Sequence, residues 1–284
     1  MMSKQQIPVR ELGETGEKVS ILGLGGYHIG QLPEKEAVQL IREAVDNGIT
    51  FLDNAWCYHQ GLSEKIMGKA LENGYREKVF LMTKNHGRNR ERFEKQLNDS
   101  LSRLKTDYID LLQFHEIVHD GEPEKIAAEG ALEAALEAKE AGKIRYLGFT
   151  GHRLPKLHQE MLELEVDWDT VQFPVNLLDY HYRSFQNQIM PQAREQEMAV
   201  IGMKSLAGGS IFDSGVNITA REAISYALSL PISTLVSGID SFEVLEQNLE
   251  IARNFEPLGE QQILKLRRRI QPEAYQGKHE HYKR

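Results

Sequence analysis

The chain has 284 residues, of which 40% are hydrophobic and 27% are charged, and its formal net charge is −8. This acidic balance, without a basic stretch in the main body of the chain, argues against a nucleic-acid-binding protein, and no apolar run approaches the roughly 20 residues of a transmembrane helix. The single cysteine, Cys57, excludes an intrachain disulfide, and the N-terminus lacks the apolar core of a secretory signal, so we expect a cytoplasmic protein without membrane partners.

The first predicted element is a β-hairpin over residues 9–20, because Gly13-Glu14-Thr15-Gly16 is a turn signal. Short apolar runs then alternate with stretches of helical periodicity. The runs predict eight strands, at residues 21–24, 49–52, 79–83, 108–114, 144–149, 170–172, 199–203 and 233–236. The intervening stretches predict helices at residues 34–47, 62–71, 90–104, 124–141, 155–164, 185–196, 219–230 and 241–254.

Eight strand-helix units favour an α/β fold closed into a (β/α)8 TIM barrel, with the N-terminal hairpin closing its bottom. An open sheet would more often show a dinucleotide-binding fingerprint after its first strand, and Gly23-Leu24-Gly25-Gly26 lacks that spacing. Residues 1–284 are predicted to form one domain. Residues 260–284 are a polar C-terminal tail, for which we expect either disorder or packing against the barrel.

Polar residues follow several predicted strands directly. Asp53, Lys84 and His115 come after the second, third and fourth strands, and Tyr58 lies just beyond Asp53. The carboxyl ends of barrel strands share one face, and that face carries the active site. The four side chains are therefore predicted to lie together.

These residues lie in segments that resemble the aldo-keto reductases. The segments are Phe51-Leu52-Asp53-Asn54-Ala55-Trp56-Cys57-Tyr58, Leu81-Met82-Thr83-Lys84 and Asp110-Leu111-Leu112-Gln113-Phe114-His115, in the order of the family. The resemblance extends from Val9 to about Ala252. It implies a barrel, an extended nicotinamide cofactor and reduction of a small aldehyde or ketone to an alcohol.

A physical reading of the four residues agrees with this resemblance. Carbonyl reduction needs a hydride at carbon and a proton at oxygen, and Tyr58 is expected to donate the proton. We expect the Lys84 ammonium to lower the pKa of the Tyr58 phenol, which is ordinarily about 10, and Asp53 to hold Lys84 in place. His115 is expected to orient and polarise the carbonyl oxygen by hydrogen bonding.

The resemblance also implies cofactor contacts, although the chain departs from the family pattern at two of them. Thr150-Gly151 replaces the usual Ser-Asn pair, so Thr150 or His152 is expected to take the role of the missing Asn. Met203 replaces the aromatic residue that stacks on the nicotinamide, and a thioether packs on a ring face as well. The predicted cofactor residues are Thr150, Gly151, Gln172, Met203, Lys204, Leu206, Gly208, Gly238, Asp240, Gln247 and Asn248.

The choice between NADPH and NADH stays open, with NADPH favoured. Gly238 and Val244 occupy the places of the basic residues that hold the 2′-phosphate in many members of the family, and Asp240 would repel a phosphate. The family's frequent use of NADPH points the other way. We predict NADPH as cofactor without excluding NADH.

The substrate contacts are predicted from loops. Trp56 follows the second strand, and Tyr27 and His28 follow the first. The loop after the fourth strand, residues 116–121, is short and predicts an open pocket that accepts varied aldehydes. The sequence sets neither the substrate nor the oligomeric state.

Two alternatives remain beside the reductase. His115-Glu116-Ile117-Val118-His119 matches the H-E-x-x-H zinc pattern, which needs a helix, whereas β-branched residues and a following turn argue against one here. A zinc hydrolase using His115 and His119 is thus a remote alternative, and no metal is predicted. The other alternative is a regulatory subunit that binds the cofactor without turnover, against which Tyr58 and Lys84 favour an enzyme.

Overall fold

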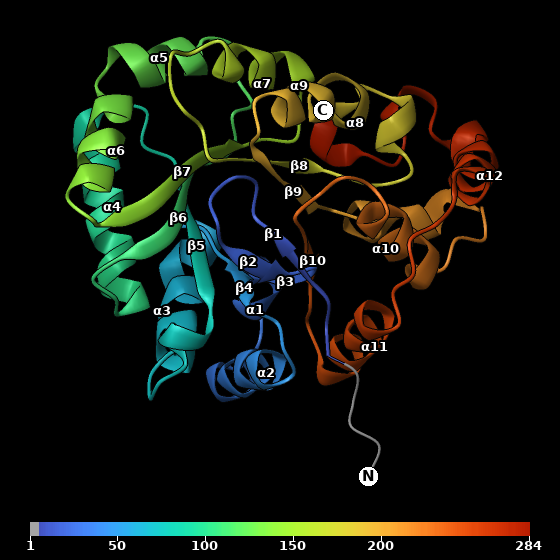
Figure 1. Ribbon diagram of the computed structural model, residues 1–284, viewed down its shortest axis with the longest axis horizontal. Coiled ribbons are helices and arrows are strands. Elements are labelled where there is room, and N and C mark those ends of the chain that lie inside the picture. Colours follow the sequence, from blue (N-terminus) through green and yellow to red (C-terminus); the bar gives the residue numbers. More distant parts are fainter. Residues whose placement is uncertain (1–5) are drawn as a thin grey trace.

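The computed structural model describes residues 6–284, so the first five residues of the predicted domain lie outside it. Eight parallel strands close into a barrel in the order β10-β3-β4-β5-β6-β7-β8-β9, and helices surround it (Figure 1). This confirms the predicted (β/α)8 barrel. The barrel strands are β3 (Leu22–Gly25), β4 (Phe51–Asp53), β5 (Phe80–Asn85), β6 (Ile109–Phe114), β7 (Ile144–Thr150), β8 (Thr170–Pro174), β9 (Ala199–Met203) and β10 (Thr234–Gly238).

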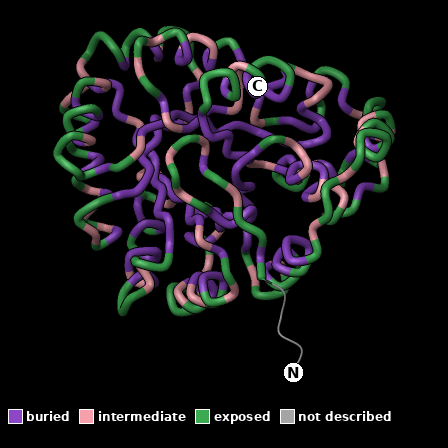
Figure 2. The backbone as a smooth tube through the Cα atoms, viewed as in Figure 1, coloured by how far each residue is buried: buried purple, intermediate pink, exposed green. Residues whose placement is uncertain are grey.

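The helices bury their apolar stripes against the strands, so the buried residues follow the barrel wall and the exposed residues lie on the outer helical turns (Figure 2). Between residues 6 and 284, no helix is long and apolar enough to cross a membrane. The α-helices are α1 (Gly26–Ile29), α2 (Glu34–Asp46), α3 (Leu62–Ala70), α4 (Arg90–Leu104), α5 (Glu122–Ala128), α6 (Ala131–Glu140), α7 (Pro155–Leu162), α8 (Phe185–Gln188), α9 (Met190–Glu195), α10 (Ala220–Leu228), α11 (Phe242–Arg253) and α12 (Glu260–Ile270).

The N-terminal hairpin consists of the antiparallel strands β1 (Val9–Glu11) and β2 (Lys18–Ser20). Its Leu12 and Val19 are fully buried and belong to the same cluster as Phe51 and Phe80 of the barrel interior. The hairpin therefore closes the bottom of the barrel, as predicted.

Two predicted helices are each divided in the structure. The helix predicted at 124–141 is α5 and α6, separated by Gly130, whose φ of +79° is open to glycine but strained for other residues. The helix predicted at 185–196 is α8 and α9, which meet at Ile189. Pro191 sits in the first turn of α9, where its missing N–H is tolerated, whereas it would break a continuous helix.

The polar C-terminal tail packs against the barrel, which settles the alternative that the sequence left open. Leu266 and Ile270 of α12 join a buried cluster that includes Leu178 and Ile211. Lys283, next to the last residue, is fully buried and its Nζ lies 2.6 Å from Asp179 Oδ1. A buried charge needs such a partner, so this ion pair anchors the end of the tail.

Candidate active site

The four predicted catalytic residues converge at the carboxyl end of the barrel. Asp53 is the last residue of β4, and Lys84 lies within β5 rather than after it. Lys84 Nζ forms a buried ion pair with Asp53 Oδ1 and donates a 2.8 Å hydrogen bond to the carbonyl of Asn54. Because both partners are almost fully buried, each charge depends on the other for compensation.

Tyr58 and His115 lie beside this ion pair. Tyr58 begins a short 3₁₀ segment, η1 (Tyr58–Gly61), and Lys84 Nζ is 5.1 Å from the centroid of its ring. His115 directly follows β6, and its ring centroid is 5.6 Å from that of Tyr58 in an edge-to-face arrangement. The structure thus brings together a phenol, an ammonium, a carboxylate and an imidazole.

Burial, and then the negative charge of Asp53, raise the pKa of Tyr58 well above its usual 10. Burial and the Asp53 carboxylate, which compensates the ammonium charge of Lys84, thus outweigh the lowering effect expected from Lys84. The Tyr58 phenol is protonated at neutral pH, which is the state that a proton donor requires.

Burial, and then the charges of Lys84 and His86, hold the pKa of His115 well below its usual 6.5. At neutral pH this histidine is an uncharged imidazole with one N–H and one free nitrogen. Such a ring can donate a hydrogen bond to a carbonyl oxygen without placing a second positive charge beside Lys84.

A groove opens next to these side chains. Six predicted cofactor residues line it together with Asp53 and Tyr58; they are Gln172, Met203, Lys204, Leu206, Gly208 and Gly238. Gln172 Nε2 donates to Asp53 Oδ2 at 2.7 Å, while its buried Oε1 has no hydrogen-bond partner among residues 6–284. An unpartnered carbonyl oxygen in a groove is suited to accept a bond from a ligand amide, so the residues fit a nicotinamide carboxamide.

The glycines of the groove also suit a phosphate-bearing ligand. Gly208 and Gly209 have φ of +69° and +92°, and a Cβ at either would meet no atom within 4 Å. They therefore leave open space beside exposed backbone, where a pyrophosphate can approach closely. Lys204, whose pKa is lowered by burial, adds an amine to the same wall.

Five further predicted cofactor residues lie outside this groove wall. Thr150 is the last residue of β7 and Gly151 follows it, and a Cβ on Gly151 would meet the Ile117 carbonyl at 2.6 Å. Asn248 is buried and donates a 3.0 Å bond to Ser237 Oγ, which ties α11 to β10. Of the remaining two, Asp240 is exposed just before α11 and Gln247 is exposed in the middle of that helix.

Of the predicted substrate residues, Tyr27 and His28 line the groove. The Tyr27 ring meets that of Tyr58 edge to face at 5.3 Å. His28 lies against Gly238, which places it on the predicted cofactor side. Trp56 turns away toward α4, where its indole N–H donates to Asp99 Oδ2 at 3.1 Å, so its predicted substrate contact has no support in this geometry.

The sequence did not identify a polar cluster centred on Glu116. His86 Nε2 and His152 Nε2 lie 3.0 Å and 3.2 Å from its two carboxylate oxygens, and hydrogen bonds from these rings hold the pKa of Glu116 far below its usual 4.5. His152 Nδ1 donates to the carbonyl of Tyr282 at 2.7 Å, so the tail joins this face.

Other groove residues were also missed, and some carried a usable signal. Gly25 and Gly26 line the groove and directly follow the first predicted barrel strand, as Ser237 follows the last. Their position at strand ends was the signal available. Ser205 belongs to the same loop as the predicted Lys204 and Gly208.

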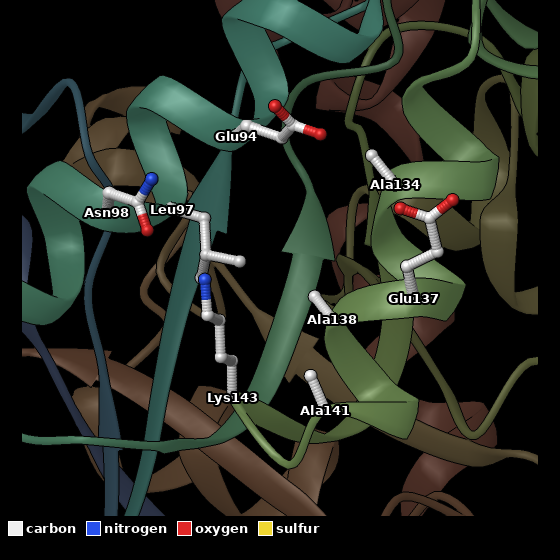
Figure 3. Close-up of a pocket in the computed structure, with 8 residues that line it drawn as sticks. All are labelled: Glu94, Leu97, Asn98, Ala134, Glu137, Ala138, Ala141 and Lys143. Atoms are coloured by element: carbon white, nitrogen blue, oxygen red, sulfur yellow. The ribbon is translucent and has the colours of Figure 1, made fainter.

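Two other features bear on the alternatives. Residues 115–119 form an irregular loop with His115 buried and His119 exposed, so the H-E-x-x-H segment lacks the helix that a zinc protease needs. A second hollow lies on the outer surface between α4 and α6, with Glu94, Asn98 and Glu137 at its edges (Figure 3). It contains none of the predicted site residues.

Comparison with known proteins adds independent findings. The family model described as the aldo/keto reductase family matches residues 21–222. Aldo-keto reductase YhdN of Bacillus subtilis is 33% identical over 214 residues, which cover 70% of this chain and 62% of YhdN, so this chain spans less than two thirds of that relative. L-galactose dehydrogenase of Arabidopsis thaliana is 29% identical, with 89% of this chain and 91% of that protein covered.

Solved structures show the same barrel. The holo form of aldo-keto reductase AKR11C1 from Bacillus halodurans is 25% identical, with 96% of this chain and 100% of that chain covered and a TM-score of 0.78. An aldo-keto reductase from Klebsiella pneumoniae, solved in complex with NADPH, has a TM-score of 0.77 at 21% identity, with 95% and 96% of the two chains covered.

Proposed function

The chain belongs to the aldo/keto reductase family, which makes it an oxidoreductase, and we propose that it uses a nicotinamide cofactor to reduce small aldehydes or ketones to alcohols. One observation carries the proposal. A protonated Tyr58 lies at the wall of a groove, between a neutral His115 and the buried Lys84–Asp53 pair.

The four side chains divide the work on the carbonyl group. Tyr58 donates its proton to the carbonyl oxygen as the carbon is reduced, and His115 orients that oxygen by a hydrogen bond. The Lys84 ammonium, 5.1 Å from the Tyr58 ring centroid, stabilises the phenolate left behind. Asp53 keeps Lys84 charged and fixed in this place.

Bound NAD(P)H would supply the hydride, and the groove residues would hold it. Gln172 would accept a bond from the carboxamide through its unpartnered Oε1, and Met203 would pack on the nicotinamide face. Gly208 and Gly209 would let backbone approach the pyrophosphate. These contacts leave Tyr58 and His115 free for the substrate.

NADPH is the preferred cofactor in this proposal, with NADH as a second one. The exposed Asp240 and Glu243 at the start of α11 would repel a 2′-phosphate and so weaken the preference. The ratio of kcat/KM for the two cofactors measures it directly, and a ratio above roughly 100-fold in favour of NADH, equivalent to about 2.7 kcal/mol, would overturn the preference.

The test is oxidation of NADPH and of NADH at saturating 4-nitrobenzaldehyde, with wild-type protein and Tyr58→Phe. We expect turnover in wild type and a fall in kcat of about 10²- to 10⁴-fold in the variant, because the proton donor is lost. Cofactor binding, followed by nicotinamide fluorescence, stays unchanged. The matched control is Tyr75→Phe, which removes an exposed hydroxyl that donates to Asp46 and leaves kcat unchanged.

Two outcomes would contradict the proposal. Equal kcat in wild type and Tyr58→Phe would show that another group donates the proton. Cofactor binding without turnover on any aldehyde or ketone would favour the regulatory subunit instead.

A further inference from the structure

Three potential metal-ligating side chains meet beside the proposed catalytic site. Cys57, His86 and His115 each bring one ligand atom within 4.8 Å of the others. Cys57 Sγ is 3.6 Å from His115 Nδ1, and the ring centroids of His86 and His115 are 4.4 Å apart. The three residues come from the loops and strand ends after β4, β5 and β6, so the closed barrel itself brings them together.

The spacing agrees with a tetrahedral zinc site. With Zn–S of about 2.3 Å and Zn–N of about 2.0–2.1 Å, tetrahedral angles separate the sulfur and nitrogen ligands by about 3.6 Å. The Cys57–His115 distance of 3.6 Å matches this edge without any movement. His86 lies within 4.8 Å of the other two ligand atoms, so its distance to the His115 nitrogen must shorten by about 1.5 Å at most, since two nitrogen ligands lie about 3.3 Å apart in such a site.

The surroundings of His86 point to a ligand as well. Its Nε2 faces Glu116 Oε2 at 3.0 Å, so the carboxylate takes the N–H and Nδ1 keeps a free electron pair. His86 Nδ1 is buried and has no hydrogen-bond partner in the part of the chain that the structure describes. A histidine whose second nitrogen donates to a carboxylate is the usual arrangement around protein-bound metals.

We propose that Cys57, His86 and His115 bind a zinc ion, with the fourth position open to water or a solute. Binding forms one Zn–S and two Zn–N bonds and releases the Cys57 thiol proton to solvent. The thiolate and two imidazoles select zinc over magnesium or calcium, which prefer oxygen ligands. His86, whose side chain is 27% exposed, gives the ion a route from solvent.

Zinc binding would regulate the reductase, and this consequence rests on the proposed function. His115 serves both the metal and the carbonyl oxygen, and Cys57 directly precedes the proton donor Tyr58. A metal bound at His115 Nδ1 fixes that ring in the orientation the ion requires and not the one the carbonyl oxygen requires, and a misplacement of about 1 Å costs on the order of 10²-fold in rate. Zinc is therefore expected to inhibit reversibly, with release by a chelator.

The binding itself is tested by titrating the full chain with Co²⁺, a spectroscopic stand-in for zinc. We expect a thiolate-to-cobalt charge-transfer band and the visible bands of a tetrahedral ion, both saturating at one Co²⁺ per chain and both displaced by Zn²⁺. Cys57→Ser should abolish the charge-transfer band, and His86→Gln should weaken binding at least 10-fold. His119→Ala, which removes an exposed histidine of the neighbouring loop, should leave the spectrum unchanged.

Saturation with no charge-transfer band, or an unchanged spectrum in Cys57→Ser, would overturn the zinc proposal. Thermal unfolding of each variant checks that it is folded. If Cys57→Ser does not fold, the weaker Co²⁺ binding of His86→Gln still tests the site. The spectrum does not depend on turnover. If the chain binds Co²⁺ through Cys57 but reduces no carbonyl, the metal site stands and the proposed function is refuted. If it reduces carbonyls but does not bind Co²⁺ through Cys57, the proposed function stands and the metal site is refuted.

Discussion

The two ends of the barrel both contain buried charges, but they use them differently. At the amino end, Asp110 accepts from Arg76 and Arg145, each at 2.8 Å, and from the backbone N–H of Leu81 at 2.8 Å. Arg145 also forms an ion pair with Glu17 of the N-terminal hairpin, so the network links the hairpin to the barrel strands. Every charge there has a partner within the network.

At the carboxyl end, buried polar groups without a partner in the described part of the chain lie beside the ion pair and the groove. Gln172 Oε1 and His86 Nδ1 are buried without a partner among residues 6–284. The pKa of Tyr58 is raised and that of His115 is lowered, in both cases chiefly by burial. Polar groups that are buried but unpaired cost stability, so they are expected where a ligand completes them. We infer from this contrast that the buried charges at the amino end stabilise the barrel, whereas those at the carboxyl end serve ligand binding and catalysis.

The largest expected effect is that of Lys84→Met. This variant leaves the buried Asp53 carboxylate without its cation, and we expect a loss of about 3–5 kcal/mol in unfolding free energy together with a fall in kcat of at least about 100-fold. Urea unfolding and steady-state kinetics measure the two effects.

The double variant Lys84→Met/Asp53→Asn separates the effect on stability from the effect on kcat. Removing both charges should restore most of the stability, because no uncompensated charge remains, but not the rate. Recovery of both stability and rate would show that this ion pair is only structural, and the contrast between the two ends would disappear.

The second prediction concerns the amino end. Asp110→Ala removes the acceptor of two arginines and a backbone N–H, and we expect a loss of about 3 kcal/mol in unfolding free energy with unchanged kcat below the unfolding transition. Asp46→Ala, which breaks an exposed pair with Lys78, should cost less than about 1 kcal/mol. A large loss of kcat in folded Asp110→Ala would contradict the division of roles.

The smallest effect tests a buried histidine of the helix layer, whose Nε2 lies 3.5 Å from the backbone carbonyl of Gln172. His158 of α7 is fully buried, and burial lowers its pKa from 6.5 to about 3. The folded state therefore favours the neutral ring, and its contribution to stability is complete above pH 6.5 and is lost as the pH falls from 6.5 toward 3, because the unfolded chain takes up the proton.

Between about pH 7.5 and pH 5 this group alone should lower the unfolding free energy by about 2 kcal/mol. His158→Leu should remove that part of the pH dependence and leave kcat at neutral pH unchanged, as measured by urea unfolding and turnover at both pH values. The exposed control His119→Leu should retain the wild-type dependence. An identical pH slope in His158→Leu and wild type would show that His158 is not held neutral.

The sequence predicted the barrel and the four catalytic candidates because both follow from local pattern. Apolar runs mark buried strands, and Asp53, Lys84 and His115 interrupt those runs where the chain reaches the carboxyl end of the barrel. The structure moves Lys84 inside β5, because a long side chain paired with Asp53 can be buried at the strand end.

The features that the sequence did not predict depend on contacts between residues far apart in the chain, and the periodicity of apolar residues does not predict such contacts. Glu116 accepts hydrogen bonds from His86 and His152, which lie in two other loops. Lys283, at the end of the tail, forms an ion pair with Asp179, which is 104 residues earlier in the chain. Trp56 was predicted to face the substrate, but Asp99 of α4 supplies a partner for its indole on the other side. The sequence also overlooked Gly130 as the point where a predicted helix divides.

The most direct test of the contrast removes one hydroxyl from each end of the barrel. Tyr58 lies at the carboxyl end, and Tyr146 at the amino end donates a 3.0 Å bond to the carbonyl of Thr15. Single-turnover transfer of hydride to 4-nitrobenzaldehyde and urea unfolding would be measured for Tyr58→Phe and Tyr146→Phe. We predict a rate loss of about 10²- to 10⁴-fold without loss of stability for the first, and a loss of about 1 kcal/mol in stability with an unchanged rate for the second. Equal rates in the two variants would contradict the account.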